Sequence, residues 1–197
     1  MSIRPLERRR VSPEQIRGAA LLAARGLLRE EGAAAVTLQA VAGRVGRTHA
    51  NLLHHFGSAA GLQKALAEDI AQTVAASIEG AIEQRRAGKA TERDVIDAMF
   101  DSFRREGAGE LIGWVALTRQ REALEPIVAT IERIIRTMRA LGDPRPVDAM
   151  TLGLTLLAIG DSLAGAEIAR ACGLDRETVR EVAVTQIEGL AGSPLRD

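Results

Sequence analysis

Residues 37–56 read TLQAVAGRVGRTHANLLHHF and predict two short helices joined by a tight turn. Thr37 and Thr48 are of the residue type that caps a helix N-terminus by accepting a backbone N–H bond. Gly46 can adopt the left-handed backbone that ends a helix. Two short helices around a glycine turn, preceded by a packing helix, are the pattern of a helix-turn-helix.

The second of these helices separates an apolar face from a polar one. Leu52 and Phe56 are four residues apart, so they share one face and can pack into a three-helix interior. A DNA major groove would meet the other face and the leading end of the helix. The side chains left for that role are Arg47, His49, Ala50, Asn51 and His54.

The rest of the chain predicts further helices. Ser12, Pro13 and Gln15 form a capping-box arrangement, and Gly32 ends the helix that they open. No segment shows sustained two-residue alternation, so we expect an all-α chain of about nine helices. The expected helices are 13–31, 38–45, 49–56, 60–86, 91–105, 109–118, 122–141, 147–171 and 176–190.

Composition indicates a soluble globular protein in the cytoplasm. The chain has 197 residues, 46% apolar and 26% charged, and its one cysteine, Cys172, cannot form an internal disulfide. The start MSIRP lacks the apolar run of a signal peptide. The longest uncharged apolar stretch, residues 149–160, is too short to span a bilayer, so we expect no membrane partner.

Charge divides the chain into two parts. Residues 1–57 hold nine arginines against four glutamates, a net charge of +5, and residues 58–197 carry −5. A basic head on an acidic body predicts a polyanion-binding module joined to something else. Arg4, Arg8, Arg9 and Arg10 form a basic arm (residues 1–11), which either lies along DNA phosphates or serves as a solubilising tail.

The chain resembles the TetR family of bacterial transcription regulators over about residues 12–62. The resemblance is carried by Thr37, the pair Val41-Ala42, Gly46, the run LLHHFGS at 52–58 and Leu62. It implies a three-helix helix-turn-helix DNA-binding domain at 1–57 and a larger helical effector-binding and dimerisation domain at 58–197. It further implies a repressor without a cofactor, which binds a palindromic operator as a homodimer through its last two helices.

The chain departs from the family pattern at several positions near the predicted DNA contacts. Leu53 and His54 occupy two positions that are usually aromatic, and Ala59-Ala60 replaces a Lys-Glu pair that usually follows. The alternative hypothesis is therefore a helical ligand-binding or protein-interaction module whose DNA binding is weakened or lost. The residues expected to contact DNA are Thr37, Arg47, Thr48, His49, Asn51 and His54.

The predicted effector pocket lies in the body of the protein. Its ligand is expected to be a small apolar or amphipathic molecule, and every pocket candidate could equally be simple core. The candidates are Met99, Phe100, Phe103, Leu111, Trp114, Leu117 and Met138, with Ile134 beside them.

The remaining titratable residues predict neither an enzyme nor a metal site. No glycine-rich phosphate loop or serine with a base partner is present, and the three histidines lack a cysteine or carboxylate at ligand spacing. Asp161 lies alone in an apolar segment. It is expected either to face the ligand pocket or to pair with an arginine, such as Arg170, across the dimer.

Overall fold

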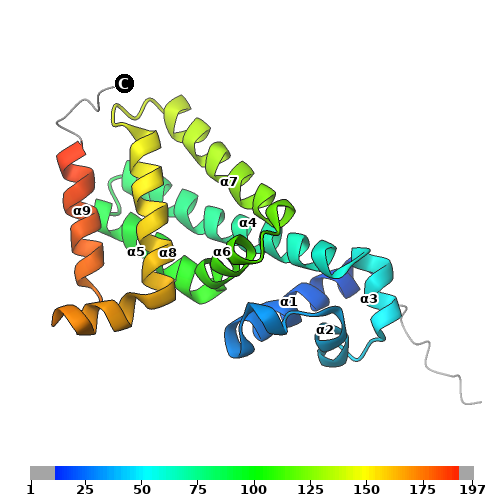
Figure 1. The fold of residues 1–197 in the computed structure, drawn as a ribbon. Coiled ribbons are helices and arrows are strands. Elements are labelled where there is room, and N and C mark those ends of the chain that lie inside the picture. Colours follow the sequence, from blue (N-terminus) through cyan, green and yellow to red (C-terminus); the bar gives the residue numbers. More distant parts are fainter. Residues whose placement is uncertain (1–11, 191–197) are drawn as a thin grey trace, which may run out of the picture.

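The computed structural model describes residues 12–190, which form nine α-helices and one 3₁₀ turn (Figure 1). No strand occurs within this range. The elements are α1 (Pro13–Glu31), η1 (Ala33–Ala35), α2 (Leu38–Arg44), α3 (His49–Phe56), α4 (Ala59–Arg86), α5 (Glu92–Glu106), α6 (Ala108–Leu117), α7 (Arg121–Ala140), α8 (Val147–Cys172) and α9 (Thr178–Leu190).

The predicted all-α fold is confirmed, and every expected helix lies within two residues of its predicted bounds. The largest shift is at α9, which begins at Thr178 instead of residue 176. The short turn η1 was not predicted, because three alanines carry no signal for it. The basic arm at residues 1–11 lies outside the described residues.

Side-chain caps explain why the helices begin where they do. Ser12 Oγ accepts the backbone N–H of Gln15 at 3.2 Å, and the Gln15 side chain accepts the Ser12 N–H at 2.9 Å, as the predicted capping box requires. Ser58 Oγ accepts the Gly61 N–H at 2.9 Å and begins α4. Thr91 and Asp94 form a second capping box at α5, which the sequence analysis did not identify.

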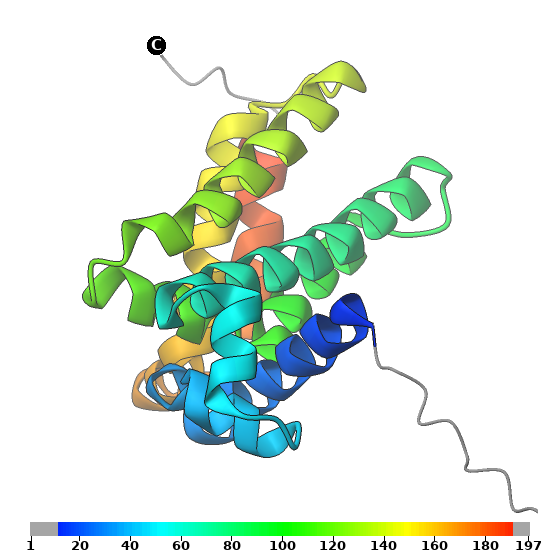
Figure 2. The same ribbon diagram turned by 90° about the vertical axis from the view of Figure 1, so that its right-hand side faces the viewer.

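The helices form a small head and a larger body. The head is the three-helix unit α1–α3, which lies at one end of α4 in both views (Figures 1 and 2). In the body, α4–α9, α4 packs against α5 and α7, while α8 packs against α5, α6, α7 and α9.

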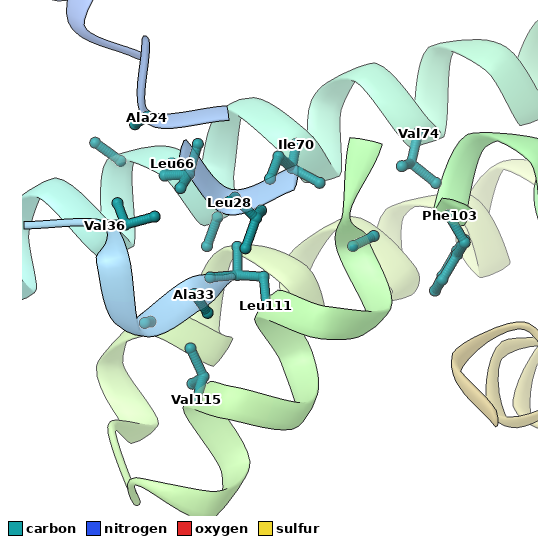
Figure 3. Close-up of a cluster of buried hydrophobic side chains, with 14 of the residues drawn as sticks. Ala24, Leu28, Ala33, Val36, Leu66, Ile70, Val74, Phe103, Leu111 and Val115 are labelled. Atoms are coloured by element: carbon teal, nitrogen blue, oxygen red, sulfur yellow. The ribbon is translucent and has the colours of Figure 1, made fainter. Parts of the chain in front are cut away.

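The apolar core continues from the head into the body. Leu28 of α1 and Val36 are each 1% exposed, as is Leu111 of α6. Figure 3 shows Leu111 beside Leu28 and Ala33, with Val115 one turn further along α6. The head is therefore joined to the body by packed side chains as well as by α4.

Helix α8 corrects the expectation that no segment is long enough to span a bilayer. By length and composition alone, Val147–Cys172 could cross a membrane. A single such helix is weak evidence of a membrane span, although only 17% of its most apolar stretch is buried within the chain. Asp161, near the middle of α8, is only 5% exposed and is paired within the chain.

Helices α6 and α8 cross closely at Gly109. A Cβ atom built on Gly109 would lie 1.6 Å from Ser162 Oγ and 2.9 Å from Ser162 Cβ. Both distances are shorter than van der Waals contact, so glycine at this position permits the crossing. By contrast, a Cβ atom on Gly80 of α4 would meet nothing within 4 Å.

We expect Gly109→Ala to lower the free energy of unfolding by about 1–3 kcal/mol, because α6 and α8 must separate. The matched change Gly80→Ala should raise it by about 0.5–1 kcal/mol through helix propensity. Chemical denaturation of both variants measures the two effects. Equal stabilities would contradict the tight crossing.

Candidate nucleic-acid interface and ligand cavity

The head places two capped helix N-termini at its surface. Thr37 Oγ1 accepts the Ala40 N–H at 3.1 Å, and Thr48 Oγ1 accepts the Asn51 N–H at 3.2 Å. Gly46, with φ of 62°, makes the left-handed turn between α2 and α3. Thr37 and Thr48 are exposed, so their hydroxyls remain accessible at the two helix starts.

Most of the predicted DNA-contact residues are exposed. Arg47, His49 and His54 are exposed, and Arg47 forms no ion pair within residues 12–190. Leu53 adds a side chain that is 41% exposed, while Leu52 and Phe56 are buried as predicted. The exposed side of α3 is therefore basic and partly apolar, and Leu52 and Phe56 anchor the helix in the interior of the head.

Asn51 differs from its predicted outward orientation. Its side chain is half-buried, and Oδ1 is buried without a hydrogen-bond partner. The helical period accounts for the difference: Asn51 and the half-buried His55 are four residues apart, on the flank next to the buried face. Arg47, His49 and His54 are the residues of this set that remain exposed at and near α3.

Two arginines serve the architecture of the head. Arg17 Nη1 donates to the His55 backbone carbonyl at 3.4 Å, and its guanidinium lies 4.8 Å from the centroid of the Phe56 ring. Arg44 Nη2 lies 2.7 Å from carboxylate oxygens of Glu30 and Glu31. The Arg44 hydrogen bond and charge hold the pKa of Glu30 below its usual value.

The clustered histidines form no metal centre in the described part of the chain. The rings of His54 and His55 meet edge to face, with centroids 5.7 Å apart. Within residues 12–190 no group of three histidine, cysteine or carboxylate side chains is placed to hold a metal ion.

The body contains an apolar cavity of about 110 Å³. Its walls come from α4, α5, α6, α7 and α8. Of the predicted pocket residues, the structure places Met99, Phe103, Leu111, Ile134 and Met138 in its lining.

Three predicted pocket residues lie outside this cavity. Met99 and Phe103 share a face of α5, but Phe100 lies about 100° around the helix from Met99 and about 60° from Phe103. The Arg180 guanidinium lies 5.6 Å from the centroid of the Phe100 ring. Trp114 is half-buried against the core, and Leu117 is 86% exposed. Their apolar character alone did not reveal the face on which they lie.

Sequence analysis missed the largest wall of the cavity. Ile70, Val74 and Ile78 of α4 line it, as do Ile127 and Ile131 of α7. Spacings of four residues along α4 and α7 carried the signal, since they place these side chains on one face of each helix.

One end of the cavity carries four charged side chains. Arg85 and Glu92 line the cavity and are paired with each other. Arg145 lies 3.1 Å from Glu92 and 2.6 Å from Asp143. Hydrogen bonding from Arg145 lowers the pKa of Asp143, and the same bond raises the pKa of Arg145.

A single arginine of α1 ties the head to two helices of the body. Arg25 Nε lies 2.8 Å from Asp69 Oδ2 of α4, and Nη2 donates to Thr73 Oγ1 at 2.6 Å. Its Nη1 pairs with Glu106, the last residue of α5. The arginine side chain is only 17% exposed, so these bonds are largely shielded from water.

Asp161 neither faces the cavity nor needs an arginine from a second copy of the chain. It pairs with Arg176 of its own chain, with Arg176 Nε 2.9 Å from Asp161 Oδ1. This hydrogen bond raises the pKa of Arg176. Arg170 lies 3.9 Å from Glu167 instead. Asp161 thus fixes the segment between α8 and α9 and does not line the cavity.

Comparison with known families identifies the head. Residues 20–66 match the family model described as bacterial regulatory proteins, tetR family. No curated protein sequence matches the chain.

Solved structures share the fold over nearly the whole chain. Multidrug binding protein EbrR, complexed with imidazole, is 17% identical, with a TM-score of 0.66 over 92% of this chain and 96% of that one. A putative TetR-family transcriptional regulator from Rhodococcus sp. is 17% identical, with a TM-score of 0.65 over 91% of this chain and 100% of the other. Superantigen PfiT is 22% identical, with a TM-score of 0.58 over 93% and 100%.

The protein therefore has the architecture of a helix-turn-helix transcription regulator. Its head matches the TetR family model, and the chain as a whole shares its fold with solved structures that include a putative TetR-family regulator, which confirms the resemblance inferred from the sequence. Regulators of this family are in general non-enzymatic proteins that bind DNA, act as dimers and respond to small molecules.

We expect Arg25→Gln to loosen the head from the body, because Asp69 and Glu106 lose their shared cation. Amide hydrogen exchange should rise in α1–α3, with a local stability loss of about 1–3 kcal/mol, and change little in α8. Arg133→Gln is the matched control, since Arg133 pairs with Glu79 between α4 and α7. Unchanged exchange in the head would contradict the linking role of Arg25.

Proposed function

We propose that this protein is a ligand-responsive transcriptional repressor in the cytoplasm, which binds a palindromic operator as a homodimer and leaves it when an effector fills the cavity. The observation that carries the proposal is the pairing of an exposed basic recognition surface with a separate apolar cavity on the same core. The functional division falls near residue 57, between α3 and α4.

DNA recognition is assigned to the exposed end of the head. Arg47, His49 and His54 supply the side chains for base edges and phosphates, and the hydroxyls of Thr37 and Thr48 supply phosphate contacts at two helix starts. Asn51 has a smaller role, because it is half-buried. Leu53 and Ala59-Ala60 replace residues that are usual in the family pattern near the DNA contacts. These replacements favour the second candidate function, a ligand-binding module with weak DNA affinity.

Dimerisation is assigned to α8 and α9. Leu152, Leu156 and Leu163 are 63%, 60% and 49% exposed, and their spacings of four and seven residues form one apolar stripe along α8. Val182 of α9 is 50% exposed as well. A second copy of the chain covering this stripe would also supply the second recognition helix that a palindromic operator requires.

Effector response is assigned to the shared wall of cavity and core. Leu111 lines the cavity and also packs beside Leu28 of the head (Figure 3). A cavity of about 110 Å³ is smaller than the roughly 300–1,000 Å³ of ordinary ligand sites. A ligand of ordinary size therefore binds a more open arrangement of these helices, and its preference for that arrangement supplies the coupling.

The first experiment is a gel shift with the DNA immediately upstream of the protein's own gene, at two salt concentrations and with excess nonspecific competitor. Specific retardation with a dimer-sized footprint supports the regulator. Retardation that disappears with competitor favours the ligand-binding module.

Removing the exposed Arg47 side chain should weaken operator binding without affecting the fold. We expect Arg47→Ala to weaken operator affinity about tenfold or more, and Asn51→Ala to have the smaller effect. The double variant should remain a dimer by sedimentation. Arg44→Ala is the control, because Arg44 is already paired with Glu30 and Glu31. Loss of folding in the double variant would show that these side chains are structural.

The exposed histidines predict that their side chains contribute to DNA binding. His49 and His54 are exposed on α3, where ring nitrogens can reach phosphates and base edges. Replacing both residues with alanine should weaken operator affinity and leave the fold unchanged. Fluorescence anisotropy at fixed ionic strength measures both proteins, and an unchanged affinity would contradict the contact.

A further inference from the structure

A second pocket of about 420 Å³ adjoins the charged end of the apolar cavity. The two share Ile82, Arg85 and Met138 in their linings, so one ligand can reach from one into the other. Unlike the inner cavity, this outer pocket is bordered by charged groups. It lies between the end of α4 and the segment that joins α7 to α8.

The lining of the outer pocket has a positive charge balance. Arg85, Arg86 and Arg145 contribute three guanidinium groups, against the single carboxylate of Asp143. Asp143 is already paired with Arg145, because both of its carboxylate oxygens accept hydrogen bonds from that side chain, at 2.8 and 2.6 Å. Arg86 is exposed and has no ion-pair partner within the described residues.

Arg85 can turn to a ligand without leaving a charge unpaired. Its partner Glu92 has a second cation, Arg145, at 3.1 Å. Asp143 likewise keeps Arg145 when Arg85 moves, and its own distance to Arg85 is already 3.9 Å. If Glu92 turned to a ligand instead, Arg85 would keep only its 3.9 Å contact with Asp143. Arg85 is therefore freer than Glu92 to bind a ligand.

We propose that the effector is an amphipathic anion whose apolar end fills the inner cavity and whose carboxylate, sulfate or phosphate head binds Arg85 and Arg86 in the outer pocket. This inference rests on the proposed function, in which the cavity binds the effector. Guanidinium groups hold such heads through paired, charge-assisted hydrogen bonds. A cationic head would instead meet the exposed Arg86, which has no ion-pair partner within the described residues, and the excess positive charge of the lining.

The sizes of the two spaces set the shape of this ligand. An apolar cavity of about 150 Å³ accommodates benzene, so the inner space of about 110 Å³ must widen to take an alkyl chain or a single ring. The outer pocket leaves room for a head larger than a carboxylate.

The test compares eight-carbon compounds that differ only in the head. Octanoate, octyl phosphate, octyl sulfate, 1-octanol and octyltrimethylammonium are titrated into the full-length protein below their micellar concentrations, with isothermal calorimetry as the readout. At least one anion should bind tenfold or more tightly than 1-octanol, and the ammonium compound should bind most weakly. The ranking of the three anions identifies the head.

Variants of the outer pocket assign the effect to its arginines. Arg85→Gln should weaken anion binding about tenfold and leave 1-octanol unchanged, and Arg86→Gln should act in the same direction about threefold. Arg133→Gln is the control, since Arg133 lines neither pocket. If Arg85→Gln does not fold, the double variant Arg85→Gln, Glu92→Gln removes both members of the pair and should show the same selective loss.

Three results would overturn the proposal. They are equal binding of octanoate and 1-octanol, tightest binding of the ammonium compound, and no binding of any compound to the folded protein. Operator binding is measured separately on the same preparation. Retained operator binding together with any of these results would reject the anionic effector and leave the DNA-binding function standing.

Discussion

The joint between head and body is the contact on which the rest of the structure depends. Leu28, Ala33 and Leu111 form its apolar centre, and Arg25 closes its edge with bonds to α4 and to the end of α5. Packed interiors move between discrete arrangements more readily than they deform smoothly. A change in the cavity wall therefore reaches the head through a small number of rigid contacts.

In the proposed regulator, the cavity and its charged end would contribute two kinds of interaction to ligand binding. The apolar walls of α4 and α7 would supply most of the binding free energy, because they remove hydrocarbon from water. The network of Arg85, Glu92, Asp143 and Arg145 would add selectivity, since partly buried charges discriminate strongly by sign. Neither feature depends on the residues of the head.

Local signals predicted the helices well, and the site only in part. Ser12, Thr37 and Gly46 carry their structural roles in their own chemistry, so caps and turns could be located from the sequence. Whether Phe100 or Phe103 faces the cavity depends on the position of α9 and on Arg180, which lies far away in the chain. The partner of Asp161 could not be predicted for the same reason: Arg176 is brought to it by the turn between α8 and α9.

Helix α4 also connects the head to the charged end of the cavity as one continuous helix. Its 28 residues make a rod about 42 Å long at 1.5 Å rise per residue, with the head at one end and Arg85 near the other. A tilt of about 5° around one end of such a rod displaces the other end by about 4 Å. Successive base pairs of DNA are about 3.4 Å apart, so in the proposed regulator a small angular change at the cavity would be enough to move the DNA-binding helix by about one base pair.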